Sequence, residues 1–152
     1  MSAPALDLKD RRIIQALLEN ARVSFSQIGR CIGLSQPAVS ERVRRLERLG
    51  VITGYGARVN NAALGLDVQV IIRVRTQFGH APACLDLCAR LPQVLDVYKV
   101  TGEDSFVLRC AFAGPGELDQ VVTKFALYGL VTTSVVLAHA ISRPPRLTRD
   151  AS

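Results

Sequence analysis

The stretch CIGLSQPAVSERVRRLERLG, residues 31–50, decides how the first part of this chain folds. Gly33-Leu34-Ser35 ends one apolar segment and starts another. Ser35 is typical of a helix N-cap, because its hydroxyl can accept a hydrogen bond from a free N–H of the first turn. Pro37 then falls in that first turn, where a proline removes no intrahelical hydrogen bond. The pattern predicts a turn and then a helix that Gly50 ends.

The predicted helix has two different faces. Its inward stripe is apolar and consists of Val39, Val43 and Leu46. Its outward side holds Gln36, Pro37, Ser40, Glu41, Arg44, Arg45 and Arg48. Gln36 and Ser40 lie in the first turns, where a recognition helix meets base edges, and the arginines further along suit phosphates or guanine edges. The N-terminus capped by Ser35 also offers free N–H groups. We expect this helix to bind DNA; the alternative is an amphipathic helix whose arginines only keep one face solvated.

Two further helices are predicted before this stretch. The first lies within residues 6–22, with Asp7 as its N-cap. Its apolar residues recur at helical spacing and are Ile13, Ile14, Leu17, Leu18 and Ala21. The second begins with a capping box of Ser24 and Gln27 and stops at Gly33. With the helix after Ser35 they form a helix-turn-helix, and the β-like pieces of VITGYGARVN, residues 51–60, predict a hairpin that would make it winged.

The rest of the chain alternates strands and helices. It is read as a strand, a helix, two strands, a helix and a strand, at residues 66–76, 81–92, 94–101, 105–112, 116–129 and 132–142. This βαββαβ order predicts a ferredoxin-like antiparallel sheet with both helices on one face, so the other face must be covered by something else. The predicted class is α+β. Its parts are a winged helix-turn-helix domain at 1–52, a wing and linker at 53–65, a second domain at 66–142 and a mobile tail at 143–152.

Charge and cysteine usage narrow the function. The chain carries a net charge of +6, and residues 1–60 hold ten basic but only five acidic residues, which favours a polyanionic partner. No apolar run reaches transmembrane length and the N-terminus lacks the apolar region of a signal peptide, so we expect a cytoplasmic protein without a membrane partner. The cysteines sit in apolar patterns and are expected to be buried thiols: Cys31, Cys84, Cys88 and Cys110. The sequence shows no metal-binding, cofactor-binding or catalytic motif.

Residues 6–60 resemble the DNA-binding half of the Lrp/AsnC family of bacterial and archaeal transcription regulators. The matching positions are Leu6-Asp7 with Asp10, Arg22, Gly33-Leu34-Ser35, Arg42-Val43 with Leu46-Glu47, and Gly50-Val51-Ile52 running into Tyr55. VTGEDSFVLRC, residues 100–110, is similar to a stretch of the family's amino-acid-sensing, ACT-like domain. The resemblance covers residues 6–142, nearly the whole chain.

The resemblance implies a regulator that binds double-stranded DNA and responds to a small effector, usually an amino acid. It adds Arg22 to the expected DNA-binding residues. It implies homodimers that pack the sheet faces of two sensing domains and that assemble further into tetramers or octamers. The effector residues it implies lie at subunit interfaces and are Thr101, Gly102, Glu103, Asp104, Ser105, Ser134, Val135 and Val136.

The expected effector turn departs from the commoner family pattern of Gly-acid-aromatic-Asp. Asp104 stands in the aromatic place and Ser105 in the place of the second Asp. A glycine lets backbone N–H groups approach a carboxylate, and an acid can meet an ammonium group, so the turn suits a zwitterion. The alternative is a tight turn with solvated acids.

Two other functions stay open at this stage. One is an architectural DNA-compacting protein that ignores small molecules. The other is an enzyme similar to the sirohaem-type decarboxylases, which would need His or Arg around a large pocket. His80 is better explained as a surface or capping residue, and His139 as a histidine on the last strand in phase with Val135, Leu137 and Ile141.

Overall fold

The computed structural model describes residues 4–145, which form two compact units. The first contains residues 4–58 and 142–145, and the second contains residues 59–141. Most of the tail expected at 143–152 lies outside the described residues. Within residues 4–145, no helix is long and apolar enough to cross a membrane.

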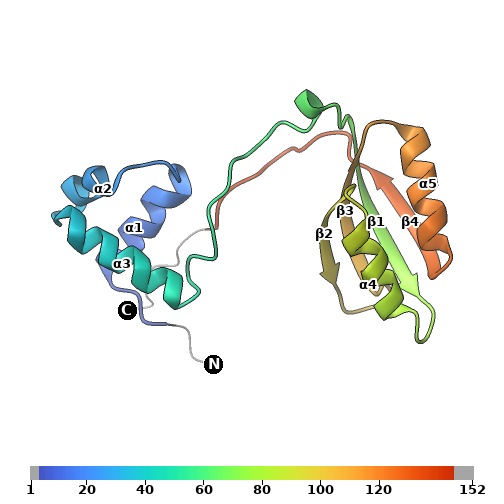
Figure 1. The fold of residues 1–152 in the computed structure, drawn as a ribbon, viewed down its shortest axis with the longest axis horizontal. Coiled ribbons are helices and arrows are strands. Elements are labelled where there is room, and N and C mark those ends of the chain that lie inside the picture. Colours follow the sequence, from blue (N-terminus) through green and yellow to red (C-terminus); the bar gives the residue numbers. More distant parts are fainter. Residues whose placement is uncertain (1–3, 146–152) are drawn as a thin grey trace. The chain divides into compact units, whose positions relative to one another are not determined.

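The first unit is built from three helices (Figure 1). They are α1 (Leu8–Glu19), α2 (Phe25–Ile32) and α3 (Gln36–Arg48). One aliphatic core joins them, and it is formed by Ile13, Ile14, Ile28, Val39, Val43 and Leu46. The predicted inward stripe of α3 is therefore confirmed.

Each helix of this unit starts at a side-chain cap. Asp7 accepts from the Asp10 N–H at 2.8 Å, and the Asp7 N–H donates back to the Asp10 carboxylate. Ser24 accepts from the Gln27 N–H at 3.2 Å in the expected capping box. These local bonds satisfy the free N–H groups of the first turns and fix where the helices begin.

The turn between α2 and α3 forms as the sequence predicts. Gly33 ends α2 with φ 67°, a left-handed conformation that favours glycine. Ser35 then accepts from the Ala38 N–H at 3.4 Å, and Pro37 lies in the first turn of α3. The helix-turn-helix is thus present.

The wing predicted at residues 51–60 is wrong, because no strand forms there. The N–H groups of Val51 and Ile52 donate to the Leu46 carbonyl at 2.9 and 3.2 Å and so close the end of α3. Their side chains pack on the three-helix core. The chain then continues without regular structure to a short 3₁₀ turn, η1 (Ala62–Leu64).

The second unit is a four-stranded antiparallel sheet with two helices. Its elements are β1 (Val68–Thr76), α4 (Ala81–Arg90), β2 (Val94–Lys99), β3 (Phe106–Phe112), α5 (Pro115–Ala126) and β4 (Gly129–Val135). The strand order is β2-β3-β1-β4. The predicted βαββαβ arrangement and the α+β class are confirmed.

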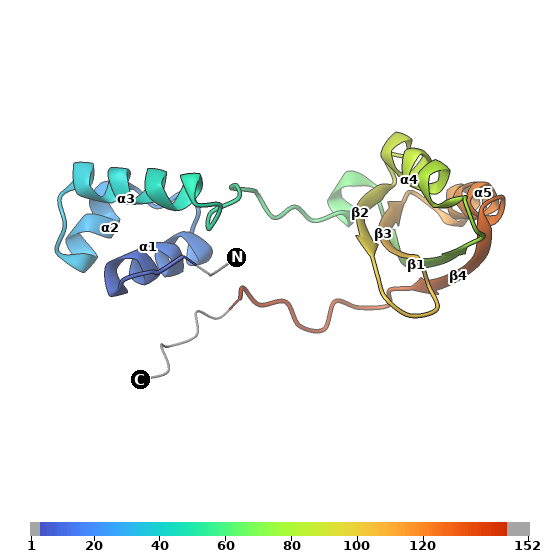
Figure 2. The same cartoon turned by 90° about the horizontal axis from the view of Figure 1, so that it is seen from below.

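Both helices cover the same face of this sheet (Figure 2). The core between them takes alternate residues of the central strands, including Val70, Ile72 and Leu108. The intervening residues, such as Ile71 and Arg73, point to the opposite face, which no other segment of this unit covers.

α4 packs Cys84, Leu87 and Cys88 against the sheet and leaves Leu85 exposed. One local prediction in this unit is wrong. The last strand ends at Val135, so His139 lies beyond it and not on a strand.

Candidate nucleic-acid interface and effector turn

The outer side of α3 presents polar residues from its first turn onward. Gln36, Pro37, Glu41 and Arg44 are exposed, and Ser40 is half-buried. The buried stripe of Val39, Val43 and Leu46 fixes which side points outward. An exposed helix N-terminus with Gln and Ser side chains can donate to and accept from base edges and phosphates.

The arginines of α3 are not equivalent. Arg42 Nη1 donates to Asp7 at 2.7 Å and to Asp10 at 2.8 Å, and Arg45 Nη1 donates to Asp10 at 3.0 Å. Within the described residues, the Arg44 guanidinium has no hydrogen bond or ion pair to another side chain. Arg44 is therefore the arginine of this helix that is most available to a phosphate.

Glu41 and Arg48, both expected on the DNA-binding side, lie two turns apart and form a pair. Arg48 Nη2 donates to the Glu41 carboxylate at 3.2 Å, and both side chains are exposed. An exposed ion pair of this kind contributes little to stability, so a phosphate can compete for Arg48. Arg22 lies apart from α3, in the loop after α1, and its side chain is exposed.

A contact that the sequence did not reveal holds the chain after α3 in place. The Tyr55 hydroxyl donates to the Glu47 carboxylate at 2.8 Å. Desolvation, together with this carboxylate, raises the pKa of Tyr55 to about 12. Tyr55 therefore stays protonated and keeps donating to Glu47 at neutral pH and well above it.

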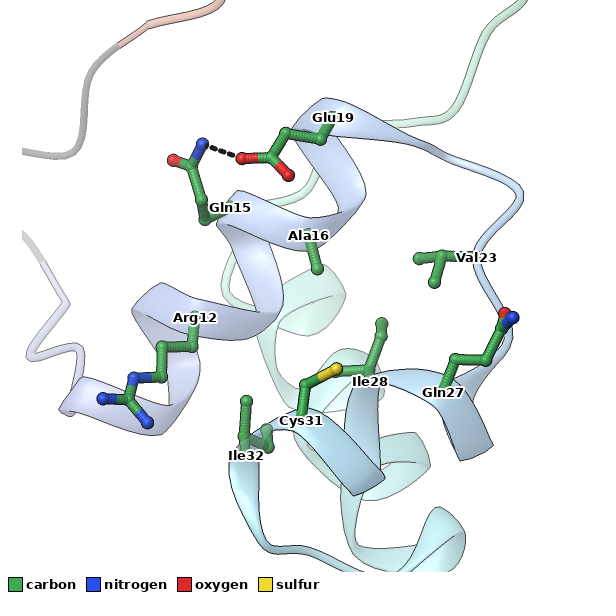
Figure 3. A pocket seen from close by; sticks show the side chains of 9 residues that line it. All are labelled: Arg12, Gln15, Ala16, Glu19, Val23, Gln27, Ile28, Cys31 and Ile32. Carbon is green, nitrogen blue, oxygen red and sulfur yellow. Dashed lines mark hydrogen bonds between the residues drawn. The ribbon is translucent and has the colours of Figure 1, made fainter.

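A shallow cavity of about 350 Å³ lies between α1 and α2 (Figure 3). Its wall is largely apolar and includes Ala16, Ile28 and Ile32, with Arg12 near one end. Cys31 also lines it and is exposed, so the expectation that all four thiols are buried is wrong for Cys31. The reason is the position of Cys31 on the side of α2 that faces this cavity rather than the core.

The expected effector turn lies at the start of β3. Gly102 has φ 108°, which favours glycine over residues with a Cβ. Ser105 Oγ accepts from the Thr76 N–H at 3.1 Å and lies 2.9 Å from the Thr76 hydroxyl. Glu103 forms an ion pair with Arg75. Several polar groups of the turn thus already have partners on β1.

The second expected effector segment, Ser134 to Val136, lies at the other end of β1. Ser134 is opposite Ile71, and the Val136 N–H donates to the Gln69 carbonyl at 2.8 Å. Ser105 lies beside Thr76, five residues along the same strand, or about 17 Å away. One chain therefore does not bring the two effector segments together.

These features define a DNA-binding regulator made of a helix-turn-helix unit and a four-stranded α+β unit. The chain matches the AsnC-type helix-turn-helix domain over residues 6–47 and the Lrp/AsnC ligand binding domain over residues 69–145. It belongs to the Lrp/AsnC family and is a transcriptional regulator of that type.

Relatives and solved structures agree with this assignment. The transcriptional regulator AldR of Mycolicibacterium smegmatis is 35% identical over 122 residues, which cover 78% of this chain and 71% of AldR. The structure of Bacillus subtilis LrpC has a TM-score of 0.86 and 28% identity, covering 92% of this chain and all of LrpC. A feast or famine regulatory protein from M. tuberculosis, solved with L-methionine, has a TM-score of 0.85 and 30% identity and covers 95% of this chain and 100% of its own.

The family assignment removes the enzyme alternative. The curated relatives are named as transcriptional regulators, and the family is not enzymatic. His80 lies at the start of α4 with its ring 6.2 Å from that of Tyr128 in an edge contact, which is a packing role.

Proposed function

We propose that α3 lies in the major groove of duplex DNA, with Gln36 and Ser40 toward base edges and Arg44 on a phosphate. The observation that carries this proposal is the exposed, Ser35-capped start of α3 on the side away from the core. Side chains there can discriminate bases. The Arg44 guanidinium has no side-chain partner in the part of the chain that the structure describes, so it can neutralise a phosphate without breaking an ion pair.

The remaining expected contacts have secondary roles in this proposal. Pro37 shapes the first turn, and Arg22 approaches the backbone from the loop after α1. Arg48 leaves its ion pair with Glu41 and pairs with a phosphate instead. Arg45 was also expected to contact DNA, but this proposal gives it no such contact, because its partner Asp10 is buried.

Measuring affinity for duplex DNA as a function of salt tests this placement. The logarithm of the binding constant falls linearly with the logarithm of the salt concentration. The magnitude of this slope decreases by about 0.9 when each bound helix loses one phosphate contact. We expect Arg44→Gln to weaken binding to every duplex and to reduce the slope by that amount. Gln36→Ala should change sequence preference with the slope kept. An unchanged slope for Arg44→Gln would show that another side of α3 faces DNA.

We also propose that an amino acid, or a related metabolite, binds where the turn at Thr101–Ser105 of one subunit meets Ser134–Val136 of another. The separation of the two segments within one chain supports a site shared between subunits. The related M. tuberculosis protein was solved with L-methionine. In this chain the Gly102 backbone can approach a carboxylate, and Asp104, half-buried beside it, can meet an ammonium group.

One observation favours an architectural protein without an effector. Glu103 is already paired with Arg75, and Ser105 with Thr76, so these two side chains of the turn are satisfied without a ligand. A thermal-shift screen with the amino acids at millimolar concentration separates the two functions, since a ligand that binds the folded state raises the unfolding midpoint. A stabilising amino acid supports the sensor, and no shift with any of them supports the architectural function.

A variant of the turn makes the sensor test specific. Gly102→Leu strains the backbone at φ 108° and adds a side chain where the proposed effector would approach the backbone. We expect this variant to lose the thermal shift while it still binds DNA. Loss of both properties would mean that the turn is needed for folding rather than for sensing.

We further propose a cytoplasmic homodimer, in which two subunits pack the uncovered faces of their sheets. The face carries Tyr98 and Leu130, which are 54% and 64% exposed in the single chain. Apolar groups at this level of exposure favour association. Tetramers or octamers of such dimers would bring the turn of one dimer against the last strand of another.

A further inference from the structure

Two carboxylates at the start of α1 reach across the first unit to the recognition helix. Asp7 caps α1, and Asp10 lies one turn further on. The sequence separation to α3 exceeds 30 residues, so no helical pattern reveals the contact. The Asp10 side chain is 0% exposed, which makes it the one buried charged side chain within the described residues.

Each oxygen of Asp10 has a partner on α3, and Oδ2 also accepts from the Asp7 N–H at 3.3 Å. Oδ1 accepts from Arg42 Nη1 at 2.8 Å, and Oδ2 accepts from Arg45 Nη1 at 3.0 Å. Arg42 Nη1 also donates to Asp7 at 2.7 Å, and Arg45 Nη2 donates to the Ala5 carbonyl at 3.4 Å. The two arginines are one turn apart, so the Asp10 carboxylate binds α3 at two positions.

We infer that Asp10 is a positioning residue for DNA recognition: it anchors α3 through Arg42 and Arg45 and withholds both arginines from the phosphates. This inference rests on the proposed placement of α3 on DNA. The two ion pairs fix the rotation of α3 about its axis and its position along α1. That rotation and position decide where Gln36 and Ser40 meet the bases.

The opposite assignment makes Arg45 a phosphate ligand that leaves Asp10 when DNA binds. The burial of Asp10 argues against it. If Arg45 left, Arg42 would still hold Oδ1, but Oδ2 of this fully buried carboxylate would lose its charged partner, which is unfavourable out of water. Arg44 and Arg48 can bind a phosphate without leaving a buried carboxylate unpaired. Arg44 has no side-chain partner among residues 4–145, and the partner of Arg48 is exposed.

The test compares neighbouring arginines in the full chain. Arg45→Gln and Arg44→Gln each remove one charge at adjacent positions, so they form a matched pair. Arg45→Gln should lower the unfolding midpoint by about 5 °C or more and leave the salt slope of duplex binding unchanged. Arg44→Gln should leave the midpoint unchanged and reduce the slope by about 0.9 for each bound helix. A reduced slope for Arg45→Gln, equal to that for Arg44→Gln, would overturn the inference.

A second readout separates positioning from plain stabilisation. The probes are a duplex selected by the wild-type protein from a random library and an unrelated duplex of equal length, both measured well below the unfolding midpoint. Arg45→Gln should lower the ratio of the two affinities about tenfold, the size of one lost base contact. Arg45→Lys, which keeps a donor for Asp10, should restore much of the ratio. A lower midpoint with an intact ratio would reduce Asp10 to a stabilising role.

A double-mutant cycle identifies the partner. Asp10→Asn, Arg45→Gln and the double variant are compared by thermal unfolding, and we expect the double variant to lose clearly less than the sum of the single losses. Additive losses would contradict the anchor. Failure of the slope test for Arg44→Gln alone would count against the proposed side of α3 and leave the anchor standing, so the two ideas can fail separately.

Discussion

The close packing of the helix-turn-helix requires a residue without a side chain at Gly29. It is buried within α2, and a Cβ built there would lie 2.4 Å from the Leu34 carbonyl oxygen. The Leu34 N–H also donates to the Gly29 carbonyl at 2.9 Å, so the turn is closed tightly over this residue. A glycine inside a helix therefore reflects a close approach of backbone rather than flexibility.

We predict that Gly29→Ala destabilises the first unit. Alanine is favoured over glycine in a helix by about 1 kcal/mol, but forced overpacking costs about 1–3 kcal/mol. The backbone of the turn cannot yield without losing its hydrogen bond, so we expect a net loss of about 1–2 kcal/mol.

Thermal unfolding followed by circular dichroism measures the effect of Gly29→Ala. Gly116→Ala is the control, because Gly116 lies in the first turn of α5 with nothing within 4 Å of a Cβ. The control should be neutral or slightly stabilising. A Gly29→Ala protein as stable as the control would show that the turn can open without cost.

The cysteines give a second prediction at the scale of single residues. Cys84, Cys88 and Cys110 are buried, and burial raises the pKa of Cys88 to about 12 and that of Cys110 to about 11. Cys31 is exposed. Because the thiolate is the reactive form, we expect one thiol per folded chain to react quickly with a maleimide and four after unfolding. Cys31→Ser should abolish the fast reaction; labelling of a second residue in the native state would contradict the burial.

At the scale of elements, the local signals were enough for the three helices of the first unit. Ser24 with Gln27, Gly33 and Ser35 act through hydrogen bonds within three or four residues, so the sequence alone located the turn. The wing was mispredicted because Val51 and Ile52 donate to the end of α3 instead of to a second strand. The alternating pattern indicated a strand but could not supply its partner.

The ends of the strands likewise depend on partners that the sequence pattern does not reveal. β4 was expected to continue to residue 142, but it ends where its partner β1 begins, at the hydrogen bond from Val136 to Gln69. Likewise, the helical wheel correctly put Arg45 outside the apolar stripe but could not show that Asp10, 35 residues earlier, already holds it. Contacts distant in sequence thus decided what the patterns left open.

The cap of α1 gives a prediction about acid stability. The pKa of Asp7 lies below its ordinary value of 3.8, chiefly because the Asp10 N–H donates to it and also because Arg42 lies beside it. A lowered pKa in the folded state means that the ionised Asp7 stabilises the fold above pH 3.8, and that this stability is lost as the pH falls through the lower folded value.

We therefore expect Asp7→Asn to unfold more easily than the wild type near neutral pH. The difference between the two unfolding midpoints should shrink as the pH falls below 3.8 and through the lowered folded pKa, because the wild-type carboxylate becomes protonated there. Measuring both midpoints across this range checks the sign. A gap that stays constant or widens in acid would rule out the cap as its source.

At the scale of the whole molecule, the two faces of the sheet are covered unevenly, which is the basis of the proposed dimer. α4 and α5 bury the middle of one face, with Val70, Ile72 and Val74 of β1 at 0% exposure. The opposite face mixes apolar side chains with arginines, two of which are paired, Arg75 with Glu103 and Arg109 with Asp96. Paired charges can enter an interface at lower cost than free ones, so this composition is compatible with a second copy as the cover.

Ile71 lies near the middle of that open face, opposite Arg109 on one side and Ser134 on the other. We predict that Ile71→Lys places an unpaired charge in the dimer interface and weakens dimerisation at least 100-fold, or about 2.7 kcal/mol. The matched control is Leu85→Lys, which makes the same type of change at an exposed apolar position on α4, on the helix side of the sheet.

Light scattering at micromolar concentration distinguishes the outcomes. The wild type and Leu85→Lys should have the mass of a dimer or a larger assembly, and Ile71→Lys should approach the mass of one chain, 16.5 kDa. Since one chain separates the two effector segments along β1, a smaller assembly should also lose any thermal shift by an amino acid. If Ile71→Lys keeps both its mass and its shift, the subunits meet elsewhere and the open face has another use.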